Sequence, residues 1–290
     1  MIVVTGATGQ LGRLIVEGLI TRVPVDQVAV SVRDVQKAQA LAARGVRVRR
    51  GDFADPRSLA HAFEGASQVL LVSSNAASYG GDPLAQHRAA IDAARSAGAR
   101  RIVYTSHMGA SPTSAFPPMR DHAATEQMLG GSGLAWTSLR NGFYAASATR
   151  LLEPGLRTGV FEAPEGGKVS WTTHADLAEA AVVVLTNEGR YEGPTPPLTA
   201  GQALDFGELC DLASSLLGRP IRRSTVSEDE MRAKLEASGM PAPAVAIMLG
   251  LYRASGDGEF SAVDPTLQQL LGRAPTGMRE VLAGPRGQTA

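Results

Sequence analysis

The chain contains a single cysteine, Cys210, so it cannot form an intrachain disulfide. This scarcity is typical of proteins that fold in a reducing compartment, and we therefore expect a cytoplasmic protein. The apolar neighbours Leu209, Leu212 and Ala213 indicate that the thiol packs on a helix. We expect it to take no part in chemistry.

The sequence also lacks an excess of either charge, because 28 basic residues balance 28 acidic ones. Lys37, Lys168 and Lys234 are the only lysines, so arginine carries almost all of the basic charge. A balanced charge gives no support to a nucleic-acid partner or to an anionic membrane surface. We therefore expect neither partner.

A long apolar run is missing as well. The β-branched stretch at residues 2–5 is short and leads directly into glycines, with no basic segment before it. It therefore fits neither a signal peptide nor a membrane span. A chain of 290 residues can bury a full core, and we expect one large domain with a smaller appendage.

What the sequence does contain is a strand, glycine and helix pattern at residues 2–19. A β-branched run precedes Gly6, Gly9 and Gly12, and apolar residues then recur on one helical face. The glycines permit a tight turn, close approach of a pyrophosphate and close packing of the helix on the sheet. The predicted cofactor-binding positions are Gly6, Thr8, Gly9, Gln10, Leu11 and Gly12. No Lys-Ser or Lys-Thr pair follows, which excludes a kinase-type P-loop.

Strand-like and helix-like segments alternate from the start of the chain to about residue 139. This alternation predicts an α/β protein with a doubly wound parallel sheet, the Rossmann fold. After Arg140 the regularity loosens, and from about Gly218 the chain is rich in helix. We expect a dinucleotide-binding domain over residues 1–150 and a smaller C-terminal substrate lobe over 151–290. Elements at about 170–200 are expected to return to the first domain.

Individual elements follow from local patterns. The sequence predicts a helix over 35–44, a sixth strand over 135–139 and a short strand over 197–200. Capping boxes are predicted at 173–176 and 227–230, where a hydroxyl residue precedes an acidic residue by three positions.

Further cofactor contacts are expected where the predicted strands end. Arg33 follows the second strand, where a guanidinium suits a ribose 2′-phosphate and favours NADPH over NADH, although the adjacent Asp34 opposes it. Asp52 and Phe53 end the third strand, where folds of this type bind adenine; a plain turn aspartate is the alternative. Beside the ribose and pyrophosphate we expect Ser73, Ser74 and Asn75, the last in a small-residue loop that could act as a flap.

The Tyr-x-x-x-Lys pair that serves many short-chain dehydrogenases is absent. None of the five tyrosines has a lysine four residues later, and in register with Glu126 the pair would fall at Pro118 and His122. Reduction of a simple ketone needs that proton donor, because it produces an alkoxide. Reduction of a quinone produces a hydroquinone anion, a much weaker base, so a site without the pair suits quinones or similarly activated acceptors.

The combination of these motifs resembles the NmrA-like atypical short-chain dehydrogenases, and especially the type 2 NAD(P)H:quinone oxidoreductases of bacteria. The resemblance rests on the glycine turn, Val32-Arg33, residues 104–106, His122 with Glu126, and Leu139-Arg140-Asn141-Gly142. It extends from Met1 to about Leu185. It implies NADPH binding and two-electron quinone reduction without a flavin. The family also contains dye reductases and members that only sense the NADPH/NADP ratio.

His122 occupies the position at which related reductases place a catalytic lysine, so it is a candidate catalytic residue that orients substrate or donates a proton. An ordinary hydrogen-bonded histidine on a helix face is the alternative. His174 is a candidate substrate-binding residue, or simply part of a helix start. The five histidines are scattered without a metal-binding spacing, so we expect no metal site.

The stretch after the sixth strand lies where open α/β sheets bind their ligands. Asn141 and Gly142 are candidates to bind the nicotinamide end of the cofactor, and Phe143 and Tyr144 to wall a flat acceptor. A loop anchored by two aromatic residues is the alternative.

Two functions are consistent with these features. The first is an NADPH-dependent reductase of a small quinone-like acceptor, with neither flavin nor metal. The second is a non-catalytic sensor of the NADPH/NADP ratio that controls a partner protein. A reductase or isomerase of another electrophile, such as an enone or a dye, is a lesser option. The sequence leaves open whether the chain acts as a monomer or as a homodimer.

Overall fold

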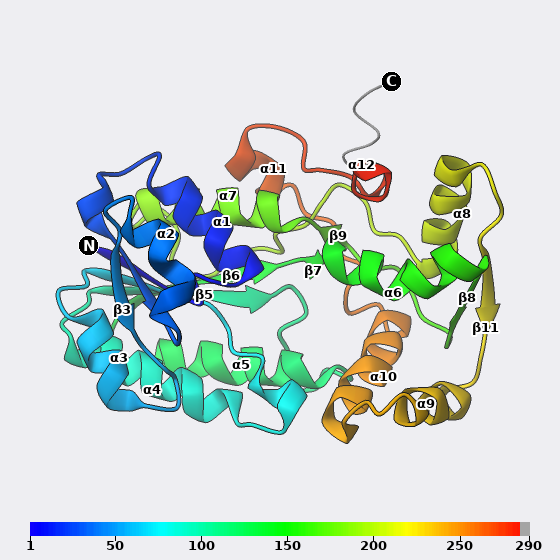
Figure 1. Cartoon of the computed structure of the whole chain (residues 1–290), viewed down its shortest axis with the longest axis horizontal. Helices are drawn as coiled ribbons and strands as arrows, with labels where there is room; N and C mark the ends of the chain where they lie inside the picture. The colour runs from blue at the N-terminus through cyan, green and yellow to red at the C-terminus, as the bar shows by residue number, and fades with distance from the viewer. Residues whose placement is uncertain (285–290) are drawn as a thin grey trace.

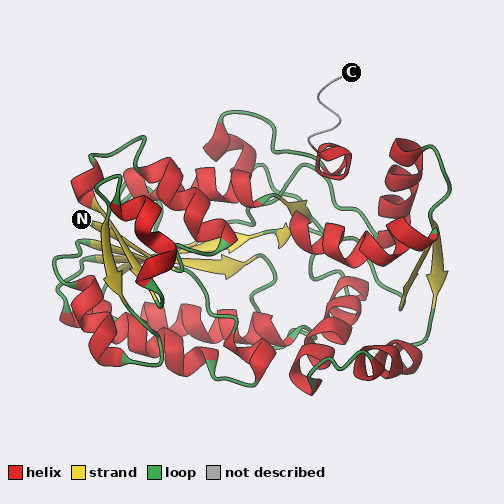
Figure 2. Cartoon of the chain, viewed as in Figure 1, coloured by secondary structure: helices red, strands yellow, loops and turns green. Residues whose placement is uncertain are grey.

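The computed structural model describes residues 1–284, and a seven-stranded sheet fills the half of it that contains the N-terminus (Figure 1 and Figure 2). Its strands are β1 Ile2–Thr5, β2 Val28–Val32, β3 Arg47–Arg50, β4 Gln68–Leu71, β5 Arg101–His107, β6 Ala135–Asn141 and β10 Gly193–Pro194. All neighbours pair in parallel, in the order β10-β6-β5-β4-β1-β2-β3. This order is that of a Rossmann fold, with one added edge strand. The predicted doubly wound sheet is confirmed.

Helices cover both faces of the sheet (Figure 1). They are α1 Gln10–Leu19, α2 Gln39–Ala42, α3 Pro56–Phe63, α4 Pro83–Ser96, α5 Pro117–Gly130 and α7 His174–Thr186. One core cluster joins α1, α2 and α7 to one face, and a second joins α3, α4 and the end of α5 to the other. Because neither face meets water, β1, β2 and β4 are buried along their whole length.

Helix α7 comes late in the chain but packs directly against α1. Gly18 of α1 makes this approach possible, since a Cβ there would lie 2.9 Å from Cγ2 of Val182. The strand β10 likewise joins the edge of the sheet beside β6. Helix α11 (Thr266–Leu271) packs against α7, and its Leu267 and Leu270 join the same core cluster.

The remaining elements form a helix-rich part, most of it around a third, aromatic core cluster. They are β7 Phe143–Tyr144, α6 Ala145–Thr158, β8 Val160–Ala163, β9 Trp171–Thr172, α8 Phe206–Leu217, β11 Arg222–Thr225, α9 Glu228–Ala237, α10 Ala242–Gly256 and α12 Met278–Ala283. Helix α9 packs on α10 through a small separate cluster of Met231, Val245 and Leu249. Cys210 is buried on α8, and burial raises the pKa of its thiol to about 11. Within the described chain no helix is both long and apolar enough to cross a bilayer. Residues 285–290 of the expected substrate lobe lie outside the described residues.

Several element predictions need correction. The predicted helix over 35–44 begins as a 3-10 turn, Val35–Ala38, because the Asp34 carboxylate accepts from the Gln36 N–H and closes a tighter turn. The sixth strand continues to Asn141 because its pairing with β5 extends to His107. Residues 197–200 form no strand: Leu198 makes one isolated bridge to Asn141.

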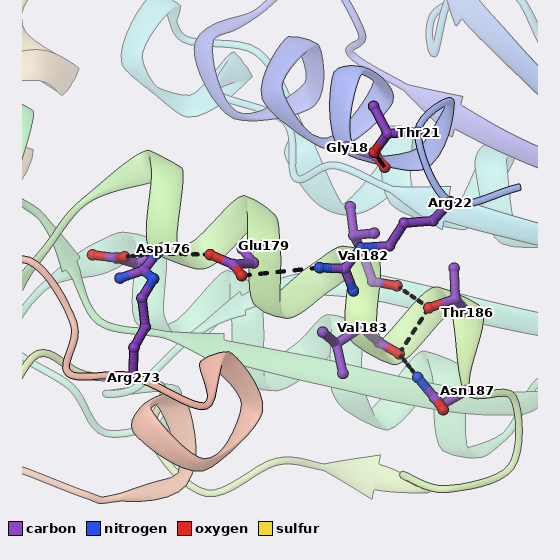
Figure 3. A network of polar contacts seen from close by, with 10 residues as sticks. All are labelled: Gly18, Thr21, Arg22, Asp176, Glu179, Val182, Val183, Thr186, Asn187 and Arg273. Atoms are coloured by element: carbon purple, nitrogen blue, oxygen red, sulfur yellow. Dashed lines mark hydrogen bonds and ion pairs between the residues drawn. The ribbon is translucent and has the colours of Figure 1, made fainter.

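The start of α7 ties the C-terminal segment to the Rossmann core (Figure 3). Thr173 caps the helix as predicted, but the fully buried Asp176 carboxylate does not return to the Thr173 N–H. It accepts from the Thr276 N–H and lies 2.8 Å from Arg273, which also pairs with Glu179 at 2.7 Å. The predicted box at Ser227 and Glu230 is complete.

Candidate functional site

The glycine turn lies at the carboxyl end of β1, which is the ligand-binding edge of a Rossmann sheet. Gly6 has φ +61°, and its carbonyl accepts from the Gly9 N–H at 2.9 Å. Gly9 is the N-cap of α1 and offers no side-chain cap, so the first N–H groups of the helix remain open to an anion. A Cβ on Gly12 would lie 2.3 Å from the Gly6 carbonyl oxygen, so only glycine fits there. These features fit a bound pyrophosphate.

The other predicted residues of the turn differ in exposure. Thr8 and Gln10 are exposed beside Gly6 and Gly9. Leu11 is buried in the core, so only its backbone can face a ligand. The side chain of Leu11 is therefore part of the packing that fixes the turn.

The ends of β2 and β3 lie at the same edge as this turn, because β2 pairs in parallel with β1 and β3 pairs in parallel with β2. Arg33 is exposed and makes no salt bridge within residues 1–284. Asp52 accepts from the Ala54 N–H at 3.0 Å, which closes a local turn. Phe53 is half-buried and packs against the cluster under α3. Asp52 thus stabilises a turn through Oδ1, and its Oδ2, with no partner up to residue 284, remains available to a ligand.

The segment after β4 is fixed by side chains from neighbouring elements. The Ser73 N–H donates to the Thr105 hydroxyl of β5 at 2.9 Å, and the Ser74 N–H donates to Nε2 of His87 on α4 at 2.8 Å. Asn75 is exposed and begins a 3-10 turn, Ala76–Tyr79. His87 was not singled out in the sequence, and Thr105 entered only as part of the 104–106 stretch of the resemblance, because nothing local links either residue to residues 73–75.

A cavity of about 270 Å³ opens beside Ser73 and Ser74 at this edge of the sheet. Phe116, Phe143 and Tyr144 give it an aromatic wall, and Ile247, Met248 and Leu251 of α10 give it an aliphatic one. Three of the five histidines also line it, His87, His107 and His122. The histidines are scattered in the sequence but gathered in space, because α4, α5 and β5 meet here. No group of three or more His, Cys, Asp or Glu residues in the described part could hold a metal ion.

These three imidazoles are held in their neutral form. Burial lowers the pKa of His122 to about 4. Burial, with repulsion from His122, lowers the pKa of His87 to about 3 and that of His107 well below its usual range. Nδ1 of His107 accepts from the Gly109 N–H at 3.2 Å, while its buried Nε2 finds no hydrogen-bond partner in the described part of the chain. The three rings therefore offer neutral hydrogen-bonding groups, whereas Arg150, which also lines the cavity, brings a cationic side chain.

Tyr104 is the closest partner of His122 in this cavity. Its hydroxyl lies 2.7 Å from Nδ1 of His122. The phenol is fully buried on β5, and burial raises its pKa. Pro118 also lines the cavity, so both positions of the absent dyad face this space.

Glu126 has a structural role that explains its place in the motif. Its Oε1 accepts from the hydroxyls of Ser106 and Ser138, both at 2.8 Å, while Arg140 donates to both carboxylate oxygens at 3.1 and 2.7 Å. The buried carboxylate thus joins α5 to the ends of β5 and β6. Of its partners, Ser106 lines the cavity.

The predicted residues after β6 have different surroundings. Asn141 is buried, and its Oδ1 has no hydrogen-bond partner among residues 1–284. Gly142 is required by packing, since a Cβ would lie 2.3 Å from the Thr172 hydroxyl. Phe143 and Tyr144 reach the cavity as a short strand paired with β9. His174 stacks on Tyr144 with ring centroids 4.2 Å apart, but it lines a separate groove beside α6 and α12.

Comparison with known proteins defines the class. Residues 6–188 match the protein family described as NAD(P)H-binding. The chain therefore belongs to the NAD(P)H-binding, NmrA-like family, and it is an enzyme of the oxidoreductase type.

Particular relatives cover nearly the whole chain. It is 35% identical to quinone oxidoreductase 2 of Escherichia coli (strain K12) over 281 residues. This match covers 97% of this chain and 96% of that protein. The crystal structure of the NADPH-dependent quinone oxidoreductase from Escherichia coli with NADPH has a TM-score of 0.90 and 34% identity, over 98% and 99% of the two chains. The Citrobacter sp. triphenylmethane reductase complexed with NADP(H) has a TM-score of 0.87 and 35% identity, over 97% and 99%.

Proposed function

We propose that this protein is an NADPH-dependent reductase that transfers a hydride to a quinone or a similarly activated acceptor. The proposal depends on one observation: the aromatic cavity lies beside Ser73 and Ser74, at the same edge of the sheet as the glycine turn. The similarity to quinone and dye reductases over nearly the whole chain supports the same reaction class.

NADP(H) is the cofactor that the residues fit. The open N–H groups of α1 suit the pyrophosphate, and the exposed guanidinium of Arg33 suits the 2′-phosphate. The unpartnered Oδ1 of Asn141 suits an amide N–H of the nicotinamide carboxamide, because a buried acceptor without a partner is costly. When bound, the reduced nicotinamide supplies a hydride. We propose no flavin and no metal.

We place the acceptor in the cavity lined by Phe143 and Tyr144. Phe143 and Tyr144 provide flat faces for a planar ring, and the aliphatic side chains of α10 close the opposite side. The helix α10 thereby supplies one wall of the acceptor cavity, while Phe116, Phe143 and Tyr144 supply the other. His122 faces the acceptor from α5.

The presence of this cavity favours a catalytic function over nucleotide sensing, because a protein that only binds the nucleotide needs no space for an acceptor. The cavity contains no Tyr-Lys dyad, and the hydroquinone anion formed from a quinone needs none. A small-molecule acceptor is therefore the expected partner.

The test is NADPH oxidation followed by its absorbance, with menadione or benzoquinone as acceptor. We expect acceptor-dependent oxidation well above the spontaneous rate. If the protein binds NADPH in calorimetry but gives no such oxidation, the reductase proposal is removed and the sensor alternative takes its place.

A further inference from the structure

The two ring nitrogens of His122 have different environments. Nδ1 faces the Tyr104 hydroxyl at 2.7 Å. Nε2 makes no hydrogen bond within residues 1–284, and the ring lines the cavity. Nε2 is therefore the atom that is available to a ligand.

The hydrogen bonds around Tyr104 determine where its proton goes. The Ser74 N–H donates to Nε2 of His87, so His87 carries its proton on Nδ1 and donates it to the Thr125 hydroxyl at 2.9 Å. Thr125 in turn donates its own proton to the Asp121 carbonyl at 2.7 Å. Thr125 has no proton left for the phenol. Thr125 can therefore act toward the phenol only as an acceptor. Within residues 1–284 the short contact of the Tyr104 hydroxyl, 2.7 Å, is with Nδ1 of His122, and this is where we assign its proton.

A neutral imidazole that accepts at Nδ1 carries its hydrogen on Nε2. Burial keeps His122 neutral at physiological pH. The bond from Tyr104 also polarises the ring, which makes the Nε2–H a stronger donor. Aromatic and aliphatic side chains form much of the cavity lining, together with serines, Asp121 and Arg150. The donor therefore lies in a partly apolar cavity, where its interaction with a developing charge is stronger than in bulk water.

We propose that Tyr104 is a positioning residue that holds His122 as the Nε2–H tautomer, and that this N–H donates to the carbonyl oxygen of the acceptor. The inference rests on the proposed reductase function and names the group that stabilises the negative charge formed on the acceptor. Hydride addition brings two electrons and one hydrogen to the acceptor and leaves one negative charge on its oxygen. The N–H of His122 stabilises that charge without being transferred, and the oxygen takes its proton from water after release.

This arrangement distinguishes between classes of acceptor. A quinone gains negative charge on oxygen, so it benefits from the donor. A cationic triphenylmethane dye takes hydride at carbon and loses a positive charge, so it gains nothing from an N–H donor. Loss of the donor should therefore slow quinone reduction selectively.

The tautomer is tested by NMR on the full-length protein labelled with ¹⁵N-histidine, with no acceptor present. We expect the His122 signals, assigned from their loss in His122→Gln, to show a protonated Nε2 and an unprotonated Nδ1. In Tyr104→Phe this difference should shrink. A protonated Nδ1 in the wild-type protein would overturn the proposal, whatever its activity.

Kinetics test the role in catalysis, with menadione as acceptor. Tyr104→Phe should lower kcat about tenfold and His122→Phe about 100-fold, with the Kd for NADPH unchanged. His122→Gln should retain more activity than His122→Phe, because its amide N–H lies near the position of Nε2. Matched controls are Tyr191→Phe and the exposed His61→Gln. Tyr104→Phe activity equal to that of Tyr191→Phe would contradict the role of Tyr104, whereas absence of quinone reduction in the wild type would remove the underlying function.

Discussion

At the scale of single residues, Arg33 shows how one side chain can set cofactor choice. It follows β2, at the edge where Rossmann folds hold the adenosine ribose. Asp34, which the sequence offered as an opposing charge, is engaged elsewhere: its carboxylate accepts from the Gln36 N–H at 3.0 Å and lies 4.0 Å from Nζ of Lys37. The guanidinium of Arg33 is therefore available to a 2′-phosphate.

Arg33→Ala should weaken NADPH binding by about tenfold to a hundredfold and leave NADH binding nearly unchanged. The reason is that a charge-assisted bidentate contact contributes roughly 1.5–3 kcal/mol, and NADH lacks the phosphate that would accept it. Calorimetric titration with both nucleotides measures the effect, with the exposed Arg57→Ala on α3 as the control. Equal losses for the two nucleotides would show that Arg33 does not touch the 2′-phosphate.

At the scale of elements, the attachment of the C-terminal segment depends on the buried start of α7. Burial alone would raise the pKa of Asp176, but hydrogen bonds from Thr173, Thr276 and Arg273 outweigh it and hold the pKa below its usual value. Arg273 comes from the loop between α11 and α12, so the pair connects that loop to the Rossmann core (Figure 3). The carboxylate has no exposed surface and depends on these partners.

Arg273→Ala should lower the free energy of unfolding by about 1–2 kcal/mol. This is less than the loss of a fully buried pair, because the Arg273 side chain is half exposed, and more than that of a surface pair. Urea denaturation measures the change. The control is Lys234→Ala, which removes an exposed pair with Glu162 and should alter stability by less than about 0.5 kcal/mol. Equal effects of the two substitutions would argue against a special role for the α7 contact.

At the scale of the whole molecule, the buried histidines make stability depend on pH. In the folded protein the pKa of His122 is about 4, that of His87 about 3 and that of His107 well below its ordinary value. In the unfolded chain each returns to about 6.5. As the pH falls through that value, the histidines of the unfolded state bind protons while those of the folded state stay neutral. The free energy of unfolding therefore decreases on acidification. The other titratable groups around these rings are Asp82, Tyr104, Asp121, Glu126 and Tyr144.

The free energy of unfolding should therefore fall between pH 7 and pH 5, with a slope of at most about 4 kcal/mol per pH unit for three histidines. Urea denaturation at pH 7, 6 and 5 measures it. His61→Gln serves as the control, since His61 is exposed and its removal should leave the slope unchanged. The same stability at pH 7 and pH 5 would show that the three rings are not held neutral.

The features that could be predicted from the sequence are those that depend on residues close together in the chain. The capping box at Ser227 and Glu230 was predicted correctly because its two residues lie only three positions apart, and the first strand and its glycine turn because they are contiguous in the sequence. Helix α6 was not predicted, because Pro154 and Gly155 resemble a break. Gly155 is in fact required inside the helix, where a Cβ would lie 2.8 Å from Phe161. The strands β7 and β9 have two residues each, too few for an alternating pattern.

The sequence by itself determined the glycine turn, the order of alternating elements and the absence of the Tyr-Lys pair. Each of these is a matter of spacing along the chain, which backbone geometry converts directly into structure. Only the tertiary structure decided what surrounds the acceptor cavity. His87, Tyr104 and His122 come from three elements and meet because parallel strands align their carboxyl ends and helices cover them. A hydrogen bond such as that between Tyr104 and His122 leaves no trace in local sequence, because it depends on how the layers pack.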